Sequence, residues 1–262
     1  TQGLAIPILF YKGGINACLW NTRGLRHHKP ALRKAKCDEV WQLSRDYQVI
    51  ALLEAHGSPS SLQVCLAQVL RTHFLFTSHM KDDNGDTVSD AGGLCVLVSK
   101  ALFGIPVSEF PVVISPPPGV ASFSQLINGR AIQLSLYHEE NGNQKWMHFF
   151  FIHNYGFSAF QTDFLIKAIS RKRDLSLNFP RLHSCILMGD FNLEPKGSRR
   201  LKLTDPAGLS GEFNHETLSP PRPFEAKWNK LFDALLEIDY PLPSHLHVAT
   251  LTLSKINRTF AV

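Results

Sequence analysis

The sequence predicts an α/β fold in which two β-sheets are layered against each other and helices cover their outer faces. Short apolar strands alternate with segments of helical spacing. Asn141 and Gly142 mark a tight hairpin turn between two of the strands, and several strands end in a polar residue. The chain has 262 residues, 44% hydrophobic and 19% charged, which is enough to bury a sizeable core.

The first half of the chain alternates strands and helices. Apolar runs predict strands at residues 15–20, 49–53, 73–78 and 93–99. Apolar residues at helical spacing predict helices over residues 30–47 and 59–70, the second after a Ser-Pro-Ser start. The polar, glycine-bearing segment 81–93 predicts a loop.

The second half begins with a proline-rich break at residues 116–119. Strands are expected at 131–137 and 146–153, paired as a hairpin, followed by a helix at 161–175 and a strand at 185–188. Segments 220–223 and 240–243 predict rigid loops. No stretch resembles an interdomain linker, so residues 1–262 are interpreted as a single domain.

Composition argues against several classes of protein. No apolar run approaches the length of a membrane span, and the apolar segment 4–11 lacks the flanks of a signal peptide. The five cysteines form no C-x-x-C pair, which argues against a zinc site and for a reducing, intracellular (nuclear or cytoplasmic) compartment. No small organic cofactor is expected. Because the chain opens with Thr1 and its first methionine is Met80, it resembles a piece of a longer reading frame.

Positive charge is clustered along the chain. Lys and Arg total 27 against 22 Asp and Glu, with clusters at residues 23–36, 171–173 and 199–202. Such clusters form either a solvated helix face or a surface that follows nucleic-acid phosphates, and charge alone does not decide between them. On the second interpretation, the DNA-contacting residues are Arg26, Lys29, Arg33, Lys34, Arg199 and Arg200.

Several predicted strands are followed by polar residues of catalytic type. They are Asn21, Glu54, the run His153, Asn154 and Tyr155, and the pair Asp190 and Asn192. One carboxylate at a strand end is usually a capping or surface acid, but loops at one sheet edge can gather residues that are distant in sequence. A recurrence at four strands therefore indicates a shared site.

The segment ILMGDFNLEP, residues 186–195, carries the most specific chemistry. Strand alternation places Asp190 and Asn192 on one side and Phe191 in the core, while Gly189 would allow a tight turn. A carboxylate can take a proton from water, and an amide can hold that water or a phosphate oxygen. With Glu54 on a hard cation such as magnesium, these groups suit metal-assisted attack of water on a phosphate ester.

The sequence GDFN at 189–192 resembles the signature of the endonuclease/exonuclease/phosphatase superfamily. Other matching segments follow in the family's order: CLWNTRGL (18–25), ALLEAHGS (51–58), GGLCVLVSK (92–100), FIHNYG (151–156) and TLTLSKINRTF (250–260). The nearest resemblance is to the endonuclease domain of non-LTR retrotransposons, because SKINR follows the threonine- and histidine-bearing segment LPSHLHVAT.

This resemblance implies a two-sheet, four-layer sandwich of the DNase I-like type and hydrolysis that depends on Mg²⁺ or Mn²⁺. It implies that Glu54 binds the metal, with Asn21 supporting metal or phosphate. Tyr155 would contact the scissile phosphate, Asp190 would activate or orient the attacking water, and Asn192 would hold phosphate or water. Asn21 as a turn residue and Tyr155 as a rim aromatic residue are the structural alternatives.

Two departures from the family pattern concern the general acid. The family usually has aspartate where this chain has Asn257, and asparagine cannot stabilise a cationic imidazole in the same way. The chain also ends at Val262, before the family's final Ser-Asp-His motif, which predicts a domain that lacks its last strands and has impaired catalysis. His56, His153 and His247 belong to other motifs and are expected to be poor substitutes.

Three functions are consistent with the sequence. The first is a DNA-nicking, metal-dependent endonuclease domain of a retroelement, which the basic clusters favour. The second is a phosphatase of inositol phosphates or of another small phosphoester. The third is a non-catalytic remnant that binds nucleic acid. In each case no membrane partner is expected.

Overall fold

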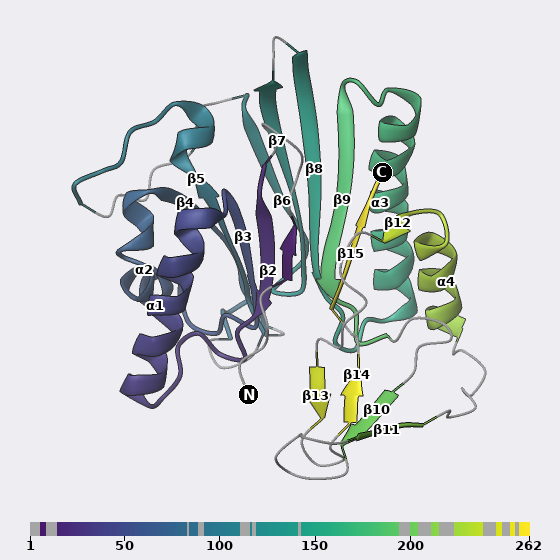
Figure 1. Cartoon of the computed structure of the whole chain (residues 1–262), viewed down its shortest axis with the longest axis horizontal. Coiled ribbons are helices and arrows are strands. Elements are labelled where there is room, and N and C mark those ends of the chain that lie inside the picture. The colour runs from purple at the N-terminus through teal and green to yellow at the C-terminus, as the bar shows by residue number, and fades with distance from the viewer. Residues whose placement is uncertain are drawn as a thin grey trace.

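A computed structural model shows two large β-sheets packed face to face, with helices on both outer sides (Figure 1). The structure describes residues 6–8, 15–82, 84–88, 92–110, 116, 119–140, 143–193, 200–203, 211–214, 223–237, 245–247, 252–254 and 257–262. The predicted α/β layering is confirmed for this part of the chain. None of its helices is long and apolar enough to cross a membrane.

The first sheet has the strand order β1-β2-β3-β5-β4. Its strands are β1 (Ile6–Ile8), β2 (Ala17–Asn21), β3 (Val49–Leu53), β4 (His73–Ser78) and β5 (Leu94–Ser99). The pair β2 and β3 is parallel, with Asn21 opposite Leu53, and the remaining pairs are antiparallel. β2, β3 and β5 are buried along their whole length, which explains their uninterrupted apolar sequences.

Helices α1 (Pro30–Asp46) and α2 (Pro59–Cys65) cover the outer face of this sheet, as Figure 1 shows. The helix predicted over 59–70 ends early, and a 3-10 turn, η1 (Val69–Arg71), follows it. Leu66, Val69 and Leu70 are still buried, so the apolar spacing reflected packing against the sheet rather than one continuous helix. A further 3-10 turn, η2 (Lys100–Phe103), follows β5.

The second large sheet has the order β12-β15-β9-β8-β7-β6. Its strands are β6 (Ala121–Ile127), β7 (Ala131–Glu140), β8 (Asn143–His153), β9 (His183–Asp190), β12 (Leu236–Glu237) and β15 (Asn257–Ala261). The predicted hairpin of β7 and β8 is confirmed and is longer than expected. β8 and β9 run parallel, with His153 opposite Asp190.

Helices α3 (Ala159–Asn178) and α4 (Pro223–Phe232) pack on the outer face of the second sheet. A smaller sheet contains β10 (Arg200–Leu203), β11 (Gly211–Asn214), β13 (His245–His247) and β14 (Thr252–Ser254). The sequence interpretation did not predict β1, β6, β12, β15, α4 or the smaller sheet. It also placed residue 223 in a loop, whereas α4 begins there.

The two large sheets are held together by a shared apolar core. Alternate residues of the strands face this core, as strand geometry requires, while the residues between them face the helices. The inward-facing residues nearest the strand ends are Leu19, Leu53, Phe151 and Met188. This alternation decides which of the following polar residues can meet between the sheets.

Gly189 does not turn the chain, contrary to the expectation from GDFN. It lies inside β9, and a Cβ atom built on it would lie 2.6 Å from the carbonyl oxygen of Ile152 and 3.1 Å from the ring of Phe191. Glycine is therefore required because there is no room for a side chain.

Replacing Gly189 with alanine should lower the free energy of unfolding by roughly 1–3 kcal/mol, because backbone and an aromatic ring must shift to admit one methyl group. Urea denaturation measures this change, with Ser184→Ala in the same strand as the control. A Gly189→Ala protein as stable as the control would show that a methyl group can be accommodated between β8 and β9.

Candidate active site

The candidate site lies where two parallel strand pairs, one from each sheet, come to their carboxyl ends. β2 and β3 end in the first sheet, and β8 and β9 end in the second, at the lower edge of both sheets in Figure 1. Polar residues follow all four strands. The expectation that these strand ends meet at one edge is met by the structure.

Asn21, His153 and Asp190 continue the inward-facing alternation beyond Leu19, Phe151 and Met188, each by two residues. Their side chains therefore lie at the end of the core between the sheets. They are almost wholly buried, with 9%, 5% and 4% of their surfaces exposed. Buried polar side chains need hydrogen-bond partners.

One amide group joins the two sheets at this point. Asn21 Nδ2 donates to Glu54 Oε1 at 2.9 Å and to Asp190 Oδ2 at 3.0 Å. The Nε2 atom of His153 lies 3.1 Å from the same Glu54 oxygen. Four residues that are far apart in sequence thus form one hydrogen-bonded cluster.

Glu54 reaches the cluster through an unusual backbone conformation. Leu53 faces the core, so a regular strand would direct Glu54 toward the helices, but its φ of 50° turns it back. Among the described residues, the other non-glycine positions with positive φ are Arg23, His56 and Asn192, all in loops after these strands. Backbone strain of this kind often concentrates at functional sites.

Glu54 is held in its ionised form. The hydrogen bond with His153 is the main cause that lowers its pKa to about 2; the bond from Asn21 acts in the same direction, and burial opposes both. The carboxylate is therefore negatively charged at neutral pH and suited to a cation.

The GDFN segment is held in place by hydrogen bonds that two asparagine side chains donate to each other's loops. Phe191 is fully buried against Trp228 and Phe232, so its predicted core position is confirmed. The backbone N–H of Asn192 donates to Asp190 Oδ1 at 3.2 Å. The side chain of Asn192 donates to the carbonyl of Asn154 at 2.8 Å, and that of Asn154 donates to the carbonyl of Phe191 at 2.7 Å.

Asn154 was among the polar residues noted after a strand, but no role was assigned to it from the sequence. It is buried, and its amide links the loop after β8 to the loop after β9. Its position next to a strand end was the available signal for this role.

Tyr155 lies at the rim of the site rather than within the cluster. Its side chain is 68% exposed, and the guanidinium of Arg130 lies 5.0 Å from the centre of its ring. The rings of Tyr155 and His153 are 6.1 Å apart. The phosphate contact assigned to Tyr155 stays a prediction, while the position inside the site belongs to His153.

The low expectation for His153 rested on its motif alone, and the structure places this residue inside the cluster. Its ring is buried beside Glu54, and its Nδ1 atom has no hydrogen-bond partner among the described residues. His56 follows Glu54 in a left-handed turn. His247 ends β13, and its side chain lies outside the described residues.

The donor set fits a magnesium ion. Within the part of the chain that the structure describes, no three His, Cys, Asp or Glu side chains cluster into a metal centre. Magnesium needs no such cage, because it takes one or two carboxylates and keeps several waters. Glu54 would supply such a carboxylate, and Asn21 holds it beside Asp190.

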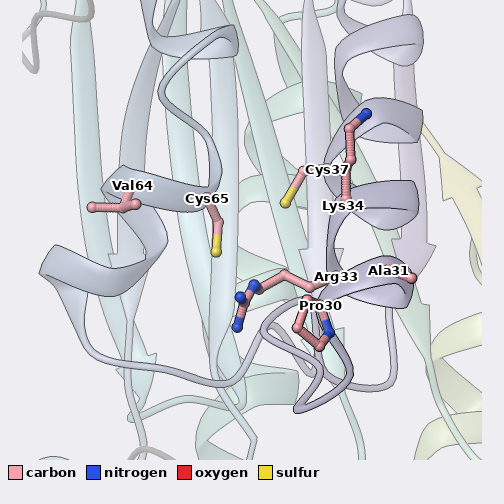
Figure 2. Close-up of a pocket in the computed structure, with 7 residues that line it drawn as sticks. All are labelled: Pro30, Ala31, Arg33, Lys34, Cys37, Val64 and Cys65. Atoms are coloured by element: carbon pink, nitrogen blue, oxygen red, sulfur yellow. The ribbon is translucent and has the colours of Figure 1, made fainter.

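The predicted DNA-contacting residues do not share one environment. Arg26 and Lys29 are exposed in the loop before α1. Lys34 is paired with Asp38 at 2.6 Å. Figure 2 shows that Arg33 extends from α1 toward α2, on the side of Cys37 and Cys65, whereas Lys34 points away. Arg199 lies outside the described residues, and Arg200 begins β10 with its side chain undescribed.

Lys36, from the same basic cluster, has a structural task. Its ammonium donates to the carbonyl oxygens of Thr22, Arg23 and Gly24 at 2.7, 3.1 and 2.8 Å. These residues form the loop that directly follows Asn21. Lys36 is thus a positioning residue that ties α1 to the site.

Several solved structures are similar to this chain. The Xenopus laevis APE2 catalytic domain has a TM-score of 0.56 at 12% identity, covering 94% of this chain and 81% of that one. The Bacteroides thetaiotaomicron mannosyl-6-phosphatase Bt3783 has a TM-score of 0.51 at 12% identity, covering 95% and 85%. D. rerio TDP2 complexed with single strand DNA product has a TM-score of 0.49 at 12% identity, covering 95% and 84%.

At this level of identity the likenesses concern the fold alone. No curated protein matches the chain by sequence. The sequence model of the Endonuclease/Exonuclease/phosphatase family matches residues 18–256, nearly the whole chain. Members of that family are typically metal-dependent. The match includes all four strand ends of the site, and the chain therefore belongs to the endonuclease/exonuclease/phosphatase family.

Proposed function

We propose that the chain is a metal-dependent phosphodiesterase that nicks DNA, as the endonuclease domain of a retroelement does. The observation that carries the proposal is the Asn21 amide that joins the Glu54 and Asp190 carboxylates, with His153 on the same Glu54 oxygen. This cluster combines oxygen ligands for a cation with a carboxylate and an imidazole that can handle protons.

Each residue of the cluster has a separate task. Glu54 is the principal ligand of Mg²⁺ or Mn²⁺, and Asn21 holds it beside Asp190. The metal, when bound, polarises a phosphate oxygen. Asp190 orients and deprotonates the attacking water, and Asn192 supports the phosphate from the adjoining turn. Asn154 keeps that turn in place.

His153 supplies the proton or hydrogen bond that the departing oxygen needs. In the resting cluster its imidazole is oriented by Glu54. Glu54 would hold the cation, and the Nε2–H of His153 would then be available to donate to a phosphate oxygen.

DNA is the proposed substrate because exposed cations lie beside the site. The Cδ atom of Arg26 is 3.5 Å from the position that a Cβ atom of Gly57 would occupy, so Arg26 adjoins the loop that follows Glu54. Lys29 is exposed three residues later. Phosphate neutralisation by such residues gives binding that is largely independent of sequence and steeply dependent on salt.

The metal assignment predicts the effect of Glu54→Gln. Calorimetry should detect magnesium binding to the native chain, weakened by more than about tenfold in Glu54→Gln because the charged ligand is removed. Glu39→Gln makes the same chemical change on the exposed face of α1 and should leave the affinity unchanged. Equal affinities in all three proteins would overturn the assignment.

The proton-transfer assignment predicts the effect of His153→Gln. Magnesium-dependent nicking of supercoiled plasmid, counted above the background of Asp190→Asn, should fall by about 10²–10⁴-fold while magnesium affinity is kept. His183→Gln, at the opposite end of β9, is the control. Nicking that survives His153→Gln would assign proton transfer to another group.

The substrate assignment predicts a change in salt dependence. Replacing Arg26 and Lys29 with serine should reduce the slope of log affinity against log salt by about 0.9 for each DNA phosphate that the protein no longer neutralises. The pair Lys167→Ser and Arg171→Ser removes the same charge from the exposed face of α3 and should leave the slope unchanged. An unchanged slope in the first pair would place the DNA elsewhere.

Two further observations separate the remaining functions. Faster hydrolysis of a small phosphomonoester than of plasmid DNA would favour the phosphatase function. A reverse-transcriptase sequence downstream in the parent reading frame would support the retroelement origin.

A further inference from the structure

A groove of about 580 Å³ lies next to the candidate active site, on the side of Tyr155. Three segments line it: residues 80–81, the turn 126–130 between β6 and β7, and the segment from the end of β8 into the first turns of α3. A volume of this size is within the usual range for small-ligand sites. The Tyr155 ring, 6.1 Å from the ring of His153, connects the groove to the catalytic cluster.

The groove exposes aromatic rings that a folded protein would ordinarily bury. Phe160 is 81% exposed and Phe164 is 45% exposed, and their spacing of four residues places them on one face of α3. Tyr155 adds a third ring that is 68% exposed. The first turn of α3 is fixed by a reciprocal capping box between Ser158 and Gln161, so the position of Phe160 is set by a rigid element.

Cationic groups accompany the aromatic rings. Arg130 lies over the Tyr155 ring and donates to the Tyr155 carbonyl at 2.8 Å, which fixes its guanidinium at the groove. Lys81 also lines the groove and is exposed to solvent. Flat rings combined with cationic side chains are the features by which proteins bind single-stranded nucleic acid.

We propose that this groove binds an unpaired nucleotide of the DNA next to the cleaved phosphate, with its base stacked on Phe160 and its phosphate near Arg130 or Lys81. The inference rests on the proposed phosphodiesterase function and adds the form of DNA that the site prefers. In a fully paired duplex the faces of the bases are covered by their neighbours. Only a flipped, bulged or single-stranded base can offer its face to a protein ring.

The charge of the groove argues against an apolar peptide as the occupant. An apolar peptide would cover Arg130 and Lys81 without offering either an anionic partner, and burying a charge that no opposite charge neutralises is costly. A nucleotide satisfies both requirements at once, because its base is flat and its phosphate is anionic.

The test measures binding separately from cleavage. Asp190→Asn prevents turnover, and in that background fluorescence anisotropy compares a duplex carrying one unpaired nucleotide with the same duplex fully paired. Phe160→Ala should weaken binding of the first duplex by about fivefold to a hundredfold and leave the second unchanged. Phe160→Trp should keep the preference. Phe179→Ala, an exposed phenylalanine at the other end of α3, is the matched control.

The outcomes distinguish this inference from the proposed function. An equal loss of affinity for both duplexes, or no loss, would overturn the nucleotide site and would leave the groove to a peptide or another ligand. The proposed function is judged independently, by magnesium-dependent plasmid nicking above the background of Asp190→Asn. Selective loss in Phe160→Ala together with absent nicking would keep the groove as a nucleotide-binding site on a chain that does not cleave.

Discussion

The site depends on one side-chain amide that bridges two sheets. Asn21 donates one hydrogen to a carboxylate of its own sheet, Glu54, and the other to Asp190 of the opposite sheet. Two neighbouring carboxylates repel each other, and the shared amide offers each of them a hydrogen-bond donor. The bridge exists only because both sheets end their parallel strand pairs at the same edge, with the inward-facing residue last.

Much of this arrangement follows from strand periodicity. Once Leu19, Phe151 and Met188 face the core, the residues two positions later must face the same gap, which places Asn21, His153 and Asp190. The fold class and the hairpin were predictable for the same reason. Glu54 was identified as a functional residue, but its direction was not predictable, because it depends on one left-handed backbone angle that no side-chain pattern records.

Other features could not be predicted, for physical reasons. In FIHNYG the sequence assigned a function to Tyr155, whereas the alternation of β8 places His153 in the cluster and the turn after Asn154 carries Tyr155 to the rim. The basic cluster could be a solvated face or a nucleic-acid surface, and the structure shows that it mixes exposed Arg26 with Lys36, whose partners are backbone carbonyls. Charge in a sequence does not reveal which cations are already occupied. β6 is half exposed, so its sequence lacks the uninterrupted apolar run that revealed its neighbours.

The interaction of Lys36 with the carbonyls of residues 22–24 makes the site sensitive to changes in helix α1. α1 packs on the outer face of the first sheet, yet its register sets the loop that follows Asn21. Three carbonyl dipoles converge on one ammonium, and without it they would repel one another. A shift of the outer helix by one residue, or the removal of that single charge by lysine acetylation, would therefore be transmitted through the first sheet to the carboxylates between the two.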